Sequence, residues 1–318
     1  MIRLISINDP QLSDHSSEKI SAVIVTHDSA LTIRACLDSL YQASMPMSIV
    51  VVDNASTDGT VELVKGQYPD VELFQSVENL GFPGGCNAAM RIAQEQGVDF
   101  YFFLNPDARV EANCPNQLFQ RLQDDEQLAF ACPLIVDTFS GRIWYAGARF
   151  DLEATNFFHH GLGEYNTGQF DHISKTGRPT ACAMMVRRSA VDEIGMMDES
   201  YFLYWEETEW ACRFIRRGYG VGLCPTAMAY HIGAHSTGGA GSPLYEYYYS
   251  RNELRFVADI TTKGKLSTTI SFAPELSRRI ASAAYRRGVP AGLGVARSVT
   301  LATFDFWRNR YGRRPGFP

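Results

Sequence analysis

In Tyr101-Phe102-Phe103-Leu104-Asn105-Pro106-Asp107-Ala108, an apolar run ends abruptly in an amide, a proline and a carboxylate. Four apolar residues before a turn predict a strand that is buried on both faces. Asn105 and Asp107 would then lie at the carboxyl edge of a parallel sheet, where open α/β proteins bind their ligands. The run therefore predicts an α/β fold with a cation-bridged ligand at this edge.

Apolar runs elsewhere in the chain predict the rest of the sheet. Residues 21–26 and 49–52 each read as a strand, and residues with helical spacing follow each of them. This alternating order is typical of a parallel sheet with helices on its faces. Residues 181–186 predict a further buried strand, whereas residues 137–178 predict a hairpin and mobile loops over the site. We expect a Rossmann-like α/β domain with a mixed, mainly parallel sheet flanked by helices.

Charge divides the chain unevenly. The net charge is −6, but the segment from Ser271 onward carries nine arginines and two acids, so that this tail stands at +7 and the remainder at −13. We expect an N-terminal extension at 1–19, the α/β domain at 20–262 and a basic helical extension at 263–318. An acidic body argues against nucleic-acid binding, and a basic tail suggests contact with a membrane surface.

Composition also excludes several classes of protein. Seven cysteines without a CxxC pair argue against a disulfide framework and a zinc site, and they fit a reducing cytoplasm. No apolar run approaches the roughly 20 residues that a membrane span needs. The glycines at 81–85 predict a loop whose backbone approaches a ligand before a helix. They form neither GxGxxG nor GxxxxGK[ST], so a dinucleotide site and a P-loop are not supported.

Acidic and imidazole side chains stand where predicted strands end. Asp107 and His231, together with phosphate oxygens of a ligand, would suit Mg²⁺ or Mn²⁺, because hard cations prefer oxygen donors. Two alternatives stay open. Asn105-Pro106-Asp107 also fits a capped turn, and His231 alone fits a structural role in the strand layer.

A cluster of acids begins the helix that follows residue 205. Glu206, Glu207 and Glu209 could be solvated first-turn acids that complement the helix dipole. Their aromatic neighbours, which include Tyr204 and Trp205, make the segment too apolar for a solvated face. A carboxylate in such a setting has a raised pKa and can act as a base near neutrality.

Five motifs, in this order, resemble family 2 glycosyltransferases of the GT-A fold, and in particular the rhamnosyltransferase-like branch. They are Ile24-Val25-Thr26, the segment from Val51 to Gly59, the segment from Asn79 to Asn87, Leu104-Asn105-Pro106-Asp107, and the segment from Asp198 to Arg213. The resemblance covers about residues 20–256. Within it, Tyr249-Ser250-Arg251-Asn252 resembles the helix that follows in the family.

The resemblance implies a role for each matched residue. Asp53 would hold the nucleotide base or ribose, and the metal-binding DxD element falls on Asn105-Pro106-Asp107. The catalytic base would be Glu207, where the family has aspartate, with Glu206 as the second candidate. The implied nucleotide site comprises Thr26, Asp28, Asp53, Asn54, Gly81, Gly84, Asn87 and Asn105, the acceptor or sugar site comprises Asp198, Tyr204, Trp205 and Glu209, and the metal site comprises Asp107 and His231.

The activity implied by this resemblance is an inverting transfer of a sugar, with rhamnose as a candidate. A dTDP- or UDP-linked donor, a divalent cation (Mg²⁺ or Mn²⁺) and a glycan or polyprenyl-linked acceptor would take part. A catalytically inactive sugar-nucleotide-binding protein and a nucleotidyltransferase are the alternatives. We expect a cytoplasmic protein whose tail contacts the inner face of the membrane, or covers the acidic body or a neighbouring subunit in a homodimer.

Overall fold

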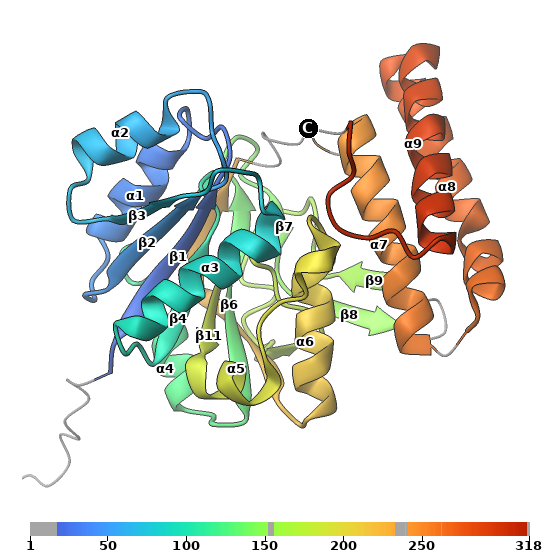
Figure 1. The fold of residues 1–318 in the computed structure, drawn as a ribbon. Helices are drawn as coiled ribbons and strands as arrows, with labels where there is room; N and C mark the ends of the chain where they lie inside the picture. The colour runs from blue at the N-terminus through green and yellow to red at the C-terminus, as the bar shows by residue number, and fades with distance from the viewer. Residues whose placement is uncertain (1–17, 152–155, 233–238, 240, 262, 317–318) are drawn as a thin grey trace, which may run out of the picture.

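The computed structural model describes residues 18–151, 156–232, 239, 241–261 and 263–316 (Figure 1). A mixed sheet forms its centre, in the order β10-β12-β6-β11-β4-β1-β2-β3, with β5 paired to β12 and β7 paired to β6. The strands of this sheet are β1 (Ile20–Thr26), β2 (Ser48–Asp53), β3 (Glu72–Gln75), β4 (Phe100–Leu104), β5 (Ala108–Val110), β6 (Leu128–Asp137), β7 (Ile143–Tyr145), β10 (Lys175–Thr176), β11 (Ala183–Arg187) and β12 (Gly220–His231). β8 (Ala148–Asp151) and β9 (Asn156–His159) form the hairpin that was predicted between 137 and 178.

Strand direction decides which side chains share an edge of the sheet. β1 runs parallel to β2 and β4, whereas β11 runs antiparallel to both β4 and β6. β6 and β12 therefore run in the same direction as β4, because they are parallel to each other. The carboxyl ends of β1, β2, β4 and β12 all meet at one edge, as the sequence predicted for the residues after β4. Every residue of β4 is buried, which confirms the predicted central strand.

Helices cover both the sheet and one another (Figure 1). Around the sheet lie α1 (Ile33–Tyr41), α2 (Thr60–Gln67), α3 (Gly81–Glu95), α4 (Cys114–Gln123), α5 (Arg188–Ile194), the 3₁₀ turn η1 (Glu199–Tyr201) and α6 (Glu206–Arg216); the C-terminal layer consists of α7 (Pro243–Thr261), α8 (Lys265–Arg287) and α9 (Val289–Trp307). Figure 1 shows the three C-terminal helices side by side on one flank of the sheet domain. Of these three, α8 and α9 confirm the helices expected in the C-terminal extension.

The C-terminal layer has an apolar core of its own. Leu254, Phe256, Phe272 and Val299 pack together in it, and Trp205 from the sheet domain joins them. Within the part of the chain that the structure describes, no helix is both long and apolar enough to cross a bilayer. The expected boundary at 262/263 stays a prediction, and the expected N-terminal extension lies, except for residues 18 and 19, outside the described residues.

The glycine segment at 81–85 is helical, and its prediction as a loop was wrong. These glycines form the first turns of α3, which lies close to the sheet. A Cβ atom on Gly85 would come within 2.6 Å of the Val25 side chain, and one on Gly81 would come within 2.4 Å of the Phe202 carbonyl oxygen. Gly81 also has a φ of +76°, which favours glycine. The glycines therefore permit close packing of α3 on its neighbours.

Candidate active site

Asp107 and His231 come together at the carboxyl edge of the sheet. Asp107 follows β4 and His231 ends β12, and the Asp107 carboxylate oxygen lies 3.2 Å from His231 Nε2. The pairing is fixed by the backbone, since Ile232 N donates to Asp107 O at 3.0 Å. His231 is 5% exposed. Burial disfavours its imidazolium form, but Cys182 and the Asp107 carboxylate raise the pKa of His231 to about 11.

This pair fits a divalent cation by its donor set. A carboxylate oxygen and an imidazole nitrogen converge, and Mg²⁺ or Mn²⁺ would take both as ligands by displacing the proton that the ring shares with Asp107. Among the described residues, no group of three or more His, Cys, Asp and Glu side chains could hold a metal ion. Two protein donors would leave the remaining positions to ligand oxygens. Among the described residues, His231 Nδ1 has no hydrogen-bond partner, and the ring packs against Trp144 with 4.5 Å between the ring centres.

The predicted nucleoside residues lie at the ends of β1 and β2. Thr26 Oγ1 donates to one Asp53 oxygen at 2.9 Å, and Ser56 N donates to the other at 3.0 Å. Asp28, which has a φ of +50°, accepts from Thr57 N at 2.7 Å. Asn54 is buried and donates to Gly81 O at 2.9 Å, while its Oδ1 has no partner in the described structure. These residues are brought together beside the edge that carries Asp107.

The other predicted nucleotide residues support the fold around the site. Asn87 donates to Met197 O and to Glu199, both at 2.9 Å, and accepts from Met197 N. Its amide therefore ties α3 to the segment before η1. Asn105 N donates to Cys182 O at 2.9 Å, which joins the turn after β4 to the start of β11. Gly84 lies buried within α3.

Glu206 and Glu207 begin α6, and their side chains have different environments. Glu207 is held by Arg178, whose guanidinium lies 2.8 Å from Glu207 Oε1, and by the Thr208 hydroxyl at 3.2 Å. Glu206 is 5% exposed, and its Oε2 has no hydrogen-bond partner among the described residues. Burial, together with the charge of Glu207, raises the pKa of Glu206 well above its usual value. Glu207 thus has a cationic partner in Arg178, whereas Glu206 has none and favours its neutral form.

The loop before α6 has an unusual backbone. Phe202, Tyr204 and Trp205 all have positive φ angles, of 65°, 67° and 73°. Side chains of this kind rarely adopt such angles, so the loop requires support from its surroundings. That support comes from Asn252 in α7, whose amide nitrogen lies 2.8 Å from both Tyr201 O and Leu203 O and 2.9 Å from Tyr204 O.

Arg251 supports the same loop from the neighbouring position. It donates to Tyr201 O at 2.9 Å and, through Nε, to Asn252 Oδ1 at 2.9 Å. Its third contact is Gly312 O at 2.8 Å, in the segment after α9. The conformation that presents Glu206 and Glu207 is therefore held by two residues of α7.

The predicted acceptor residues have structural partners of their own. Asp198 caps η1 by accepting from Ser200 N and pairs with Arg255 at 2.7 Å, and these interactions lower the pKa of Asp198 despite its partial burial. Glu209 pairs with Arg213 at 3.0 Å. Trp205 is 2% exposed and packs on Phe256. Tyr204 is half-buried, and its ring lies 4.9 Å from that of Tyr245. Their role at a sugar site stays a prediction.

Sequence reasoning missed Arg178, Arg251 and Asn252 as parts of the site. Arg178 lies in a segment without clear periodicity, so only the pairing of β11 beside β4 brings it to this edge. Arg251 and Asn252 were noticed as a family-like motif without a role. An arginine next to an asparagine in a helix rich in tyrosine was the available signal, because buried polar side chains need specific partners.

Comparison with known proteins agrees with this geometry. Residues 21–195 match the family model described as glycosyl transferase family 2. An N-acetylglucosaminyl-diphospho-decaprenol L-rhamnosyltransferase of Mycobacterium tuberculosis is 26% identical over 242 residues, which cover 70% of this chain and 78% of the relative. The dTDP-rhamnosyl transferase RfbF of Shigella flexneri is 27% identical over 248 residues, covering 74% and 79%.

A solved structure gives the fold independently. The mannosyltransferase PcManGT from Pyrobaculum calidifontis, in complex with GDP-Man and Mn²⁺, superposes with a TM-score of 0.56 at 16% identity. The match covers 92% of this chain and 82% of that one. The described architecture is the GT-A fold that the sequence predicted, with α8 and α9 added at the C-terminal end.

Proposed function

This chain belongs to glycosyl transferase family 2, and from that premise we propose that it transfers rhamnose, by an inverting reaction, from a nucleotide-diphosphate donor. A dTDP- or UDP-linked sugar is the proposed donor, because the similar Shigella protein is a dTDP-rhamnosyl transferase. The hydroxyl of a glycan or a polyprenyl-linked acceptor would receive the sugar, because the similar mycobacterial protein acts on a diphospho-decaprenol.

In the proposed mechanism, each group of residues has one task. Asp53, with Thr26 and Asp28 beside it, holds the nucleoside. Asp107 and His231 would hold a divalent cation, which when bound would offset negative charge on the leaving diphosphate. Glu207 accepts the proton of the acceptor hydroxyl as that oxygen attacks the anomeric carbon in line with the departing diphosphate.

The contrast between the two glutamates carries this assignment. A base must be ionised before it can accept a proton, and the Arg178 guanidinium lies 2.8 Å from the Glu207 carboxylate as its counter-charge. The pKa of Glu206 is raised by burial, so Glu206 favours the protonated form, which cannot act as a base. Glu207 also remains close enough to the surface of the loop for a substrate to reach it, with its side chain 10% exposed.

The test compares glutamine variants at the two positions. Glu207→Gln should abolish transfer while the binding of a dTDP- or UDP-sugar with Mn²⁺, measured by calorimetry, stays unchanged. Glu206→Gln should keep most of the transfer rate, because a neutral amide replaces a neutral acid. Glu193→Gln, on α5 and away from the edge, is the matched control. Wild-type transfer by Glu207→Gln would overturn the base assignment, and donor binding without any transfer by the wild type would favour a sugar-nucleotide-binding protein.

The location of the protein follows from the proposed acceptor. We propose that the protein works in the cytoplasm at the inner face of the membrane, where a polyprenyl-linked acceptor would be accessible. The excess of arginine after Ser271 supports contact with anionic lipid. A homodimer stays a prediction.

A further inference from the structure

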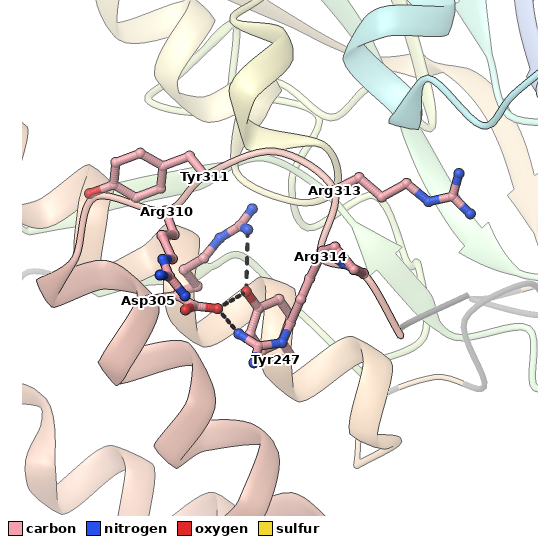
Figure 2. Close-up of a pocket in the computed structure, with 8 residues that line it drawn as sticks. Tyr247, Asp305, Arg310, Tyr311, Arg313 and Arg314 are labelled. Atoms are coloured by element: carbon pink, nitrogen blue, oxygen red, sulfur yellow. Dashed lines mark hydrogen bonds and ion pairs between the residues drawn. The ribbon is translucent and has the colours of Figure 1, made fainter.

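A basic pocket lies where the segment after α9 returns to α7. Its volume is about 270 Å³, and its lining residues are Tyr247, Arg251, Asp305, Arg310, Tyr311, Arg313, Arg314 and Pro315. Figure 2 shows these side chains coming from α7, from the end of α9 and from the segment that follows it. Four arginines and one carboxylate line the pocket, so its formal charge is positive.

One of these arginines is buried without a carboxylate partner. Arg251 is 1% exposed, and within the described residues it forms no ion pair. Its hydrogen bonds go to carbonyl oxygens, an amide and the Tyr247 hydroxyl, and its guanidinium lies 5.0 Å from the centre of the Tyr248 ring. Burial lowers the pKa of Arg251. A buried cation usually has a compensating charge, and here the protein supplies none directly.

The single carboxylate of the pocket is already neutralised. Asp305 pairs with the Arg314 guanidinium and accepts from the Tyr247 hydroxyl at 2.6 Å (Figure 2). Arg314 N in turn donates to the Tyr248 hydroxyl at 3.0 Å. These contacts fix the segment after α9 against α7, and among the described residues no carboxylate pairs directly with Arg251.

Two more arginines add charge at the mouth. Arg310 and Arg313 are exposed, and in the described part of the chain neither forms an ion pair. In Figure 2, Arg310 lies beside Asp305, whereas Arg313 extends outward from the loop. Long side chains of this kind can close over a ligand, and the guanidinium group bonds phosphate oxygens in pairs.

We propose that this pocket binds a phosphate group of a lipid, either the diphosphate of a polyprenyl-linked acceptor or the headgroup phosphate of an anionic phospholipid. The inference rests on the proposed function for its choice of a lipid-borne phosphate. The volume is several times the roughly 30 Å³ that one water occupies in the liquid, so a diphosphate fits. Arg251 connects the pocket to the loop before Glu206, since it bonds both Gly312 O and Tyr201 O.

The first experiment measures phosphate binding alone. Inorganic pyrophosphate is titrated calorimetrically into the full-length protein in EDTA, so that cation-dependent binding at Asp107 and His231 is suppressed. The Arg310→Gln/Arg313→Gln double variant should bind pyrophosphate at least tenfold more weakly, because two charge-assisted contacts are lost. Arg308→Gln removes another exposed arginine of the same region, one that does not line the pocket, and should leave binding unchanged. Equal affinity in the wild type and the double variant, or no binding by either, would overturn the proposal.

The second experiment separates the two sources of phosphate. The protein is sedimented with phosphatidylcholine vesicles that contain either a polyprenyl diphosphate or phosphatidylglycerol at matched surface charge. If the double variant fails to cosediment only with the polyprenyl diphosphate vesicles, the pocket binds the diphosphate of the acceptor. If it fails to cosediment with either kind of vesicle, the pocket binds lipid headgroup phosphates in general. Binding to both that is insensitive to the two substitutions would overturn a phosphate site in this pocket.

These outcomes are independent of the transfer reaction. Pyrophosphate and vesicle binding should persist in Glu207→Gln, because that residue does not line the pocket. If the wild type failed to transfer sugar but still bound the vesicles through Arg310 and Arg313, the proposed function would fail and the pocket would stand.

Discussion

Replacement of Asn252 by alanine should disturb catalysis as well as folding. The Asn252 amide bonds the carbonyl oxygens of Tyr201, Leu203 and Tyr204, and it is buried in α7. Its two N–H groups can satisfy at most two of these bonds fully at one time. Each buried acceptor that loses its donor costs about 1–3 kcal/mol, so the loss of two bonds should lower the unfolding free energy by about 2–6 kcal/mol.

The effect on activity arises from backbone strain. Phe202, Tyr204 and Trp205 have positive φ angles within four residues of one another. Together these angles store strain energy on the order of 3 kcal/mol or more in the loop. That strain exceeds the net value of an ordinary hydrogen bond, so without Asn252 the loop should relax. Glu207 would then move, and a displacement of about 1 Å at a reacting group can reduce kcat about 100-fold.

The assay compares melting temperature with kcat in two variants. Ser250 is buried on the same helix as Asn252, and Ser250→Ala removes the hydrogen bond that its hydroxyl accepts from Arg279 of α8 at 3.1 Å, without touching the loop. Both variants should melt at a lower temperature, but only Asn252→Ala should lose about two orders of magnitude in kcat. If Asn252→Ala melted early and kept the kcat of Ser250→Ala, the loop would not depend on this amide and the reasoning would be refuted.

Three other substitutions test separate parts of the site. Arg178→Gln removes the guanidinium that lies 2.8 Å from Glu207 and holds its carboxylate in place, so kcat should fall while donor binding is retained; an unchanged kcat would contradict a positioning contact with the base. Asp107→Asn should abolish the additional thermal stabilisation that Mn²⁺ gives in the presence of the donor nucleotide, measured by scanning calorimetry. Gly81→Ala should lower the free energy of unfolding by at least about 2 kcal/mol, because φ is +76° and Phe202 O blocks the new methyl group. Gly66→Ala in α2 is the control: a Cβ there meets open space, and the free energy of unfolding should rise by up to about 1 kcal/mol. Equal denaturant midpoints for the two variants would contradict the packing argument.

Local sequence pattern was sufficient to predict the centre of the fold. The apolar run of β4 and the polar residues after it predicted a buried strand and a ligand edge, because burial and strand direction are local signals. The side-by-side position of Asp107 and His231 could be anticipated for the same reason, since both follow strands that run in one direction. The acids at 206 and 207 were also found, through their aromatic neighbours.

Local sequence pattern could not predict the long-range contacts of the site. Arg178 meets Glu207 only because β11 is inserted antiparallel between β4 and β6. The positive φ angles at 202–205 have no sequence marker, because the residues are aromatic and not glycine. The glycines at 81–85 were misread as a loop, since the same composition serves a flexible turn and a helix that packs closely.

The contacts of Gly312 have a practical consequence for anyone who engineers the protein. Its amide donates to Ser200 O and its carbonyl accepts from Arg251, so the far end of the chain holds the turn that leads into α6. An affinity tag or a fluorescent fusion placed immediately after this segment would pull on the backbone beside the proposed base. Kinetic assays should therefore use protein that carries its tag on the N-terminal side. Shortened versions of the protein should keep the segment after α9, because it supports the turn before α6.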